Sequence, residues 1–140
     1  LRPALLRTGA ADTTGPTIVI GTVQGDIHDI GKTLVATFLE ANGFRVVDLG
    51  RDVPLETFVD AAEREGAGLV GLSALLTTTM PGQARVVSML EQRGLRSRIR
   101  VLVGGAPVTR AYAESIGADG FAANAVEAVA EARRLVGTPA

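Results

Sequence analysis

The sequence contains no cysteine and only one histidine among its 140 residues. Without cysteine, the chain forms no disulfide bond, no thiolate metal site and no cysteine nucleophile. One imidazole, with no thiolate and no dense cluster of carboxylates, also does not supply the ligands of a usual zinc site. A metal centre built from protein ligands alone is therefore not expected.

The chain also lacks an excess of charge of one sign and any long apolar run. It has 14 lysines and arginines against 15 acidic residues, so no basic field would attract nucleic acid or an anionic membrane. Its longest apolar stretch, 67–76, is far shorter than the roughly 18 residues of a membrane-spanning helix. Residues 1–15 contain no apolar core of a signal peptide. The cytoplasm is therefore the expected location.

Apolar stretches alternate with helical patterns along the chain, which is typical of a parallel sheet wrapped by helices. Strands are expected at 17–23, 44–49, 67–73, 99–105 and 120–122. Helices are expected between 30 and 43, from Pro54 to Gly66, from Pro81 to Gly94, and at 109–116 and 125–136. Five such units with right-handed crossovers predict a doubly wound, flavodoxin-like (Rossmann-like) α/β domain over 17–140, with strand order 2-1-3-4-5.

The first expected helix has an apolar face made by Leu34, Val35, Phe38 and Leu39. It is followed by Asn42-Gly43, a pair that favours a left-handed helix end.

The string TVQGDIHDIGKTLV (22–35) runs from the end of the first strand into the start of this helix, and it resembles a phosphate-binding loop. That loop requires a glycine five residues before its Gly-Lys pair, but Asp26 stands there. Asp26 and Asp29 would also repel the phosphate that the backbone amides should attract. A nucleotide is therefore disfavoured, and a loop with two acids and one histidine between glycines remains.

His28 lies in this loop and not on an apolar helix face. It could be a solvated loop histidine. Asp26, two residues away, could instead hold one ring N–H and leave the other nitrogen free to bind a metal. A single protein ligand suits a macrocycle, such as haem or a corrin, that supplies the other coordination positions.

Two further loops follow strand ends. The stretch SALLTTTMPG (73–82) carries hydroxyl groups on Ser73, Thr77, Thr78 and Thr79. These could cap the following helix or supply donors and acceptors to a groove.

The third loop is GGAP (104–107). Gly104 and Gly105 are either turn glycines or residues that let a flat ligand approach the backbone. Ligands of open parallel sheets bind beyond the carboxyl ends of the strands, near the switch in strand order. The three loops should therefore meet at one edge of the sheet and form the site.

The combined pattern is Asp26-x-His28-x-x-Gly31, Ser73-x-Leu75 and Gly104-Gly105. It resembles the cobalamin-binding module shared by methionine synthase, some adenosylcobalamin mutases and corrinoid methyl-carrier proteins. The strings GDIHDIGK, DLGRDVP, SALLTTTMPG and VGGAPVT are most similar to the corrinoid proteins of methanol, methylamine and methoxyl-group methyltransferase systems. The resemblance extends from about residue 17 to the last helix.

This resemblance implies that the benzimidazole tail of cobalamin leaves the cobalt and enters a groove in the sheet. His28 would replace it as the lower axial ligand, the base-off/His-on arrangement. Asp26 would pair with His28, and Thr79, a serine in methionine synthase, would follow it. Other cofactor contacts are implied for Gly25, Ile27, Asp29, Gly31, Ser73, Leu75, Thr77, Gly104, Gly105, Ala106, Asn124 and Ala125.

The implied function is that of a non-catalytic carrier. It would hold a methyl group on the cobalt of cobalamin, or of a related corrinoid, between a substrate:corrinoid methyltransferase and an acceptor methyltransferase. Residues 1–16 resemble a linker or the tail of a helical domain that covers the corrin in such carriers. That cover would come from the full-length chain or from another chain.

Three other classes of protein share part of this pattern or of the predicted fold. A cobalamin-dependent sensor would share the motif but would carry a DNA-binding region, which does not fit in this length. A mutase subunit would use adenosylcobalamin, and the similarity of SALLTTTMPG to methyl carriers disfavours it. A response-regulator receiver would need a phosphoacceptor aspartate at the end of the third strand, where Ser73 stands.

Overall fold

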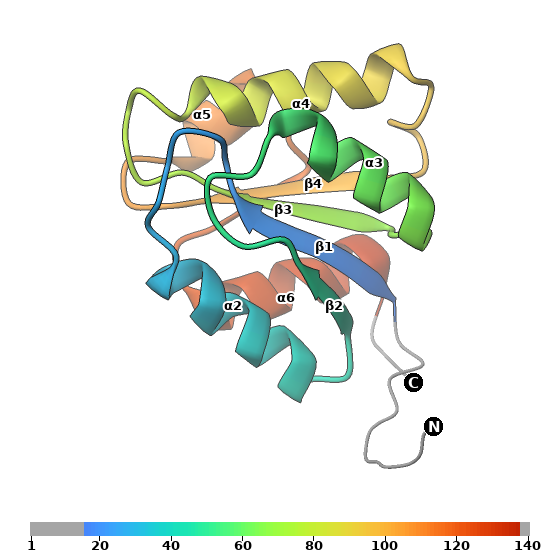
Figure 1. Ribbon diagram of the computed structural model, residues 1–140. Helices are drawn as coiled ribbons and strands as arrows, with labels where there is room; N and C mark the ends of the chain where they lie inside the picture. The colour runs from blue at the N-terminus through green and yellow to red at the C-terminus, as the bar shows by residue number, and fades with distance from the viewer. Residues whose placement is uncertain (1–15, 138–140) are drawn as a thin grey trace.

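The computed structural model describes residues 16–137 as a parallel sheet with helices on both faces (Figure 1). The strands are β1 (Thr17–Thr22), β2 (Arg45–Asp48), β3 (Leu69–Ser73), β4 (Arg100–Gly104) and β5 (Gly120–Ala122). They lie in the order β2-β1-β3-β4-β5, and every pair is parallel. The predicted flavodoxin-like fold is confirmed. Residues 1–15, which carry nearly all of the predicted linker, lie outside the described part.

The helices are α2 (Ile30–Ala41), α3 (Leu55–Glu65), α4 (Pro81–Gln92), α5 (Arg110–Ser115) and α6 (Ala125–Val136). Helices α3, α4 and α5 cover one face of the sheet, and α2 and α6 cover the other (Figure 1). Within residues 16–137, none of these helices has the length and apolar character needed to span a bilayer.

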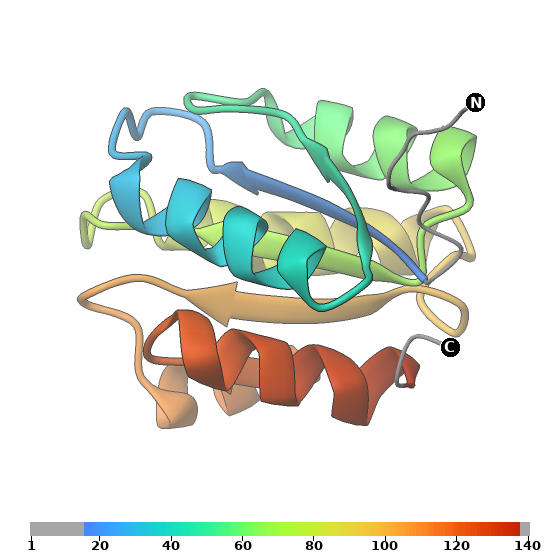
Figure 2. The same cartoon turned by 90° about the horizontal axis from the view of Figure 1, so that it is seen from below.

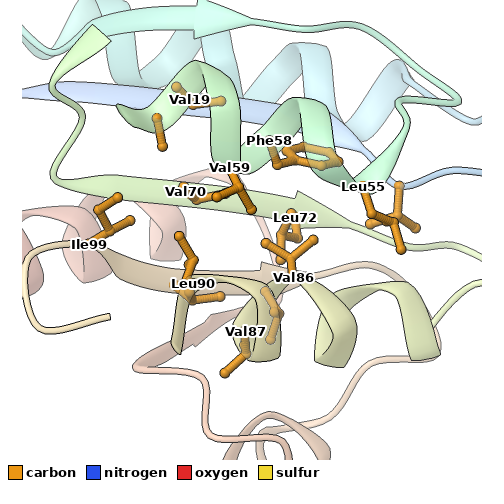
Figure 3. Close-up of a cluster of buried hydrophobic side chains, with 14 of the residues drawn as sticks. Val19, Leu55, Phe58, Val59, Val70, Leu72, Val86, Val87, Leu90 and Ile99 are labelled. Atoms are coloured by element: carbon orange, nitrogen blue, oxygen red, sulfur yellow. The ribbon is translucent and has the colours of Figure 1, made fainter. Parts of the chain in front are cut away.

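The core consists of two apolar layers, one on each face of the sheet. Strand β3 is buried on both sides, which explains its continuous apolar run. Figure 3 shows the larger layer, in which Phe58 of α3 and Leu90 of α4 pack over Val70 of β3. The smaller layer packs α2 and α6 against the opposite face. Only the strand ends and the loops beyond them are left to form a site.

The positions of glycine and proline in the sequence predicted most helix ends. Gly43 and Gly66 follow α2 and α3 with φ of +93° and +66°, as predicted from their positions. Pro81 is the first residue of α4, also as predicted. Strand β3 begins at Leu69, two residues later than expected, and α4 ends at Gln92 rather than at Gly94.

The apolar face predicted for α2 is present for three of its four residues. Leu39 is buried, and Val35 and Phe38 pack against the smaller core layer. Leu34 differs, because its side chain is 50% exposed. It lies on the flank of α2 that faces a groove rather than the core.

Candidate functional site

The three loops singled out from the sequence meet at one edge of the sheet. In the strand register, Thr22 pairs with Ser73, and Ser73 pairs with Gly104. Strands β1, β3 and β4 therefore end level with one another, and the loops that follow them are neighbours. The strand order reverses between β1 and β3, which is where a ligand site is expected in a doubly wound sheet.

The loop after β1, residues 23–29, is called the ligand loop below. It begins with a tight turn in which the Asp26 N–H donates to the Val23 carbonyl at 3.0 Å. Gly25 has a φ of +91° at the third position of this turn, where a type II turn requires a positive φ. The turn directs the Asp26 side chain into the protein, where Asp26 is completely buried.

The Asp26 carboxylate accepts four hydrogen bonds. Oδ1 accepts from the ring Nδ1 of His28 at 2.7 Å and from its backbone N–H at 3.1 Å. Oδ2 accepts from the Thr79 hydroxyl and from the Leu75 N–H, both at 2.7 Å. Burial raises the pKa of Asp26, but the bonds from Leu75, His28 and Thr79 together outweigh it and lower the pKa from 3.8 to about 2. Asp26 is therefore a stable buried anion.

This anion determines which ring nitrogen of His28 is open. A carboxylate only accepts hydrogen bonds, so the network assigns the proton of the neutral ring to Nδ1 and leaves a lone pair on Nε2. The His28 side chain is 51% exposed. Its backbone carbonyl accepts from the buried Thr22 hydroxyl at 2.9 Å. The ring is thus held through Nδ1 and its backbone through the carbonyl, so that Nε2 is presented at the edge of the sheet.

The threonine-rich loop after β3 contacts Asp26 and supplies no side-chain cap to α4. Helix α4 has Met80 at its N-cap, with no side-chain capping bond. The Thr79 hydroxyl instead lies on Asp26, so the structure brings Asp26, His28 and Thr79 together as the resemblance implied. Thr77 is exposed and does not line the groove described next, whereas Ser73 and Leu75 do.

A groove of about 330 Å³ opens beside the ligand loop. Figure 2 is seen from the side of α2 and α6 and shows β3 and β4 running between these two helices. The groove lies there because small residues line its floor and walls, namely Gly71, Gly104, Gly105, Ala106, Ala122, Ala125 and Ala128. Its volume is at the lower end of the range for small-molecule sites.

The glycines at the groove have different reasons for being glycine. A Cβ on Gly105 would collide with the Ala74 carbonyl, and one on Gly104 would lie 2.9 Å from the Ala122 oxygen. These two are required by the backbone itself. A Cβ on Gly31 would meet nothing within 4 Å, although Gly31 lines the groove. The space above Gly31 therefore belongs to the groove.

Asn124, Ala125 and Ala106 also line the groove, as the resemblance implied. The Asn124 side chain has a structural role as well, since its Oδ1 accepts from the Glu127 N–H and caps α6. Ile27 is 64% exposed beside His28, and Asp29 is half-buried at the N-cap of α2.

Two buried polar residues near the site were missed by the sequence reasoning. Lys32 is almost fully buried, and its Nζ lies 2.8 Å from both carboxylate oxygens of Asp48. This pairing neutralises the lysine of the apparent phosphate loop and agrees with the rejection of a nucleotide. Gln83 is fully buried under the sheet and donates to the carbonyls of Leu72 and Gly104.

The geometry suits a metal complex that brings most of its own ligands. Between residues 16 and 137, no group of three or more acidic or histidine side chains could hold a metal ion. The site instead offers one open imidazole nitrogen and, beside it, a narrow and mainly apolar groove. A corrin with a detached nucleotide tail needs these two features.

Comparisons with known proteins agree with this geometry. A family model of the B12 binding domain matches residues 16–131. Dimethylamine corrinoid protein 1 of Methanosarcina acetivorans is 52% identical over 132 residues, which cover 94% of this chain and 62% of that protein. The chain thus spans less than two thirds of that relative.

Two solved structures share the fold at substantial identity. A cobalamin-binding protein from Desulfitobacterium hafniense DCB-2 has a TM-score of 0.84 and 42% identity, covering 87% of this chain and 59% of that one. A chain of the methanol:cobalamin methyltransferase complex MtaBC from Methanosarcina barkeri has a TM-score of 0.83 and 36% identity, covering 93% and 50%. The chain belongs to the B12-binding domain family, as its three loop motifs predicted.

Proposed function

We propose that this chain binds cobalamin or a related corrinoid with His28 Nε2 as the lower axial ligand of cobalt and the nucleotide tail in the groove. We further propose that it carries a methyl group between a substrate:corrinoid methyltransferase and an acceptor methyltransferase. The observation that carries the proposal is the open Nε2 of a ring whose Nδ1 is bound to the buried Asp26 anion, next to the groove.

The bound cobalt would supply the chemistry, by accepting and releasing the methyl group. The contribution of His28 is a neutral imidazole, because an imidazolium has no lone pair for a metal. Asp26 keeps the proton on Nδ1 and orients the ring.

Thr79 and the Leu75 N–H hold the second oxygen of Asp26. They keep the carboxylate in one orientation and charged whether or not His28 is ligated. The groove would exclude water from the tail, and its small side chains leave room for a flat base. Gly31 would allow the tail to pass the start of α2.

The carrier role is supported by the position of the site and by the relatives. His28 lies at the open edge of the sheet and is half-exposed, so a cobalt atom bound there would be within reach of partner proteins. The relatives named above include a dimethylamine corrinoid protein and a component of a methanol:cobalamin methyltransferase complex. A helical domain of the full-length chain, or another chain, would cover the upper face of the corrin.

Electron paramagnetic resonance of the Co(II) form tests the ligand assignment. The chain has a single histidine, so labelling histidine with nitrogen-15 labels one residue only. The axial nitrogen splitting should change with the label and should disappear in His28→Ala, which should still retain part of the affinity through the groove. A splitting that ignores the label would refute the assignment.

Methyl transfer to the reduced protein tests the carrier role. Reduced to Co(I), the loaded protein should accept a methyl group from iodomethane. Methanol, methylamines and methoxylated aromatics should remain unreacted until a cognate methyltransferase is added. Rapid methylation by one of these donors without a partner would show that the chain is an enzyme rather than a carrier.

A further inference from the structure

Segment 48–53, from the string DLGRDVP, surrounds the end of β1 and has no role in the function proposed above. The Thr22 N–H donates to the Gly50 carbonyl at 2.9 Å, and the Val53 N–H donates to the Thr22 carbonyl at 3.0 Å. A bridge between Val23 and Val53 continues this pairing into the ligand loop. The segment is therefore a fixed neighbour of the loop that carries His28.

Within this segment, Asp52 makes two contacts with the turn of the ligand loop. Its N–H donates to the Asp26 carbonyl at 2.9 Å, and its Oδ1 accepts from the Gly25 N–H at 2.8 Å. These contacts bind the backbone on both sides of the Gly25–Asp26 peptide bond. They hold the turn from which the Asp26 carboxylate is directed toward His28.

The backbone of Asp52 is unusual. Its φ is +51°, and it is the only residue other than glycine with a positive φ between residues 16 and 137. Such a conformation is unfavourable for residues with a side chain, although aspartate and asparagine tolerate it best. Strain of this kind persists where surrounding contacts require it, often at functional sites. The two contacts to the ligand loop are such a requirement.

We propose that Asp52 is a positioning residue for His28 and acts through Asp26. This inference rests on the ligand role proposed for His28. Without the Asp52 carboxylate, the Gly25 N–H loses its partner and the turn can rotate. The Asp26 carboxylate then holds Nδ1 for a smaller share of the time, and more of the ring carries its proton on Nε2, which blocks ligation.

Two substitutions separate the carboxylate from the backbone conformation. Asp52→Gly removes the acceptor while its backbone adopts a positive φ freely. Asp52→Asn keeps an oxygen at the same place and tolerates the conformation, but a neutral amide is a weaker acceptor than a carboxylate. Asp60→Asn is the matched control, because it removes an exposed carboxylate of α3 that pairs with Arg93.

Nitrogen-15 NMR of the histidine ring provides a measurement on the cofactor-free protein. At pH 8.5 the wild-type ring should be mainly the Nδ1–H tautomer. The Nε2–H share should rise in the order wild type, Asp52→Asn, Asp52→Gly, while Asp60→Asn matches the wild type. A merely structural role for Asp52 would lower the unfolding midpoint in urea without changing the tautomers of the folded protein.

Binding of cobinamide, a corrinoid without the nucleotide tail, provides the second measurement. It does not depend on the groove, so its affinity reports the ligand loop. Asp52→Gly should weaken it by about 5- to 10-fold, the typical net effect of one intramolecular hydrogen bond, and should reduce the share of His28-ligated Co(II). Wild-type tautomers and ligation in Asp52→Gly would overturn the role of Asp52. Absence of His28 ligation in the wild type would instead overturn the proposed function.

Discussion

Replacing Gly31 with alanine should change stability and cofactor affinity in opposite directions. Gly31 is the second residue of α2, and a Cβ there would meet no atom within 4 Å. Alanine is a better helix former than glycine by about 0.5–1 kcal/mol in a helix interior. At the first turn we expect the lower value, about 0.5 kcal/mol. For a chain of this length, that corresponds to a rise in Tm of roughly 2 °C.

The same methyl group would occupy the groove that Gly31 lines. Inserting a methyl group into a tightly filled site typically costs about 1–3 kcal/mol. Since about 1.4 kcal/mol corresponds to a tenfold change in affinity, cobalamin should bind about 5- to 150-fold more weakly to Gly31→Ala. Cobinamide should bind the variant as it binds the wild type, because it places nothing in the groove.

Thermal unfolding of the cofactor-free protein and titrations with both corrinoids measure these effects. Ser88→Ala is the control, because Ser88 is an exposed residue of α4, on the opposite face of the sheet. It should gain a similar amount of stability and leave both affinities unchanged. A less stable Gly31→Ala would show that the space above Gly31 is not open. Normal binding of cobalamin to the variant would show that this space does not belong to the cofactor.

Three further outcomes follow from the site geometry. The pKa of Asp26 is lowered from 3.8 to about 2, so its anion contributes about 2 kcal/mol of stability above pH 4, and this contribution is lost as the pH falls toward 2. Urea unfolding of the cofactor-free protein should show this loss, and Asp26→Asn should lack it. Gly105→Ala should cost at least about 3 kcal/mol, because its Cβ collides with the Ala74 carbonyl at a φ of +125°; a stable variant in urea would contradict the backbone described here. Thr79→Val should lower the free energy of unfolding by about 1–3 kcal/mol, because it removes a donor from a buried carboxylate, whereas Thr79→Ser should keep most of the wild-type stability. Equal unfolding free energies for the two variants would show that the hydroxyl is unimportant.

The fold and the location of the site could be predicted because both depend on local signals. Strand β3 reads as a continuous apolar run, and Pro81 and Gly66 mark helix ends. The rule that ligands bind at the carboxyl ends of parallel strands then predicts that the three loops meet at one edge of the sheet. The turn at Gly25 and the strand register confirm that neighbourhood.

Residues whose partners are distant in the sequence could not be predicted in this way. The side chain of a lysine in the first turn of α2 is expected to be exposed to solvent. Only the folded chain shows that Lys32 lies against Asp48 of β2. Gln83 likewise has the sequence context of an ordinary polar residue of α4, although its partners are carbonyls of two strands. Leu34 is the opposite case, because it is an apolar residue that faces the groove and not the core. Such positions depend on tertiary packing that helical periodicity does not encode.

The bond between Asp26 and Thr79 joins residues 53 positions apart. The orientation of the His28 ring is therefore decided only after β1 has paired with β3, although Asp26 and His28 are two residues apart. Contacts between distant parts of a chain are late and slow to form, because a long loop must first be closed. A nascent or misfolded chain that lacks this pairing would present a histidine in an undefined tautomer. Capture of the corrinoid should consequently follow the completion of folding, and the rate at which the cofactor's absorption spectrum changes during refolding would report the docking of β3 onto β1.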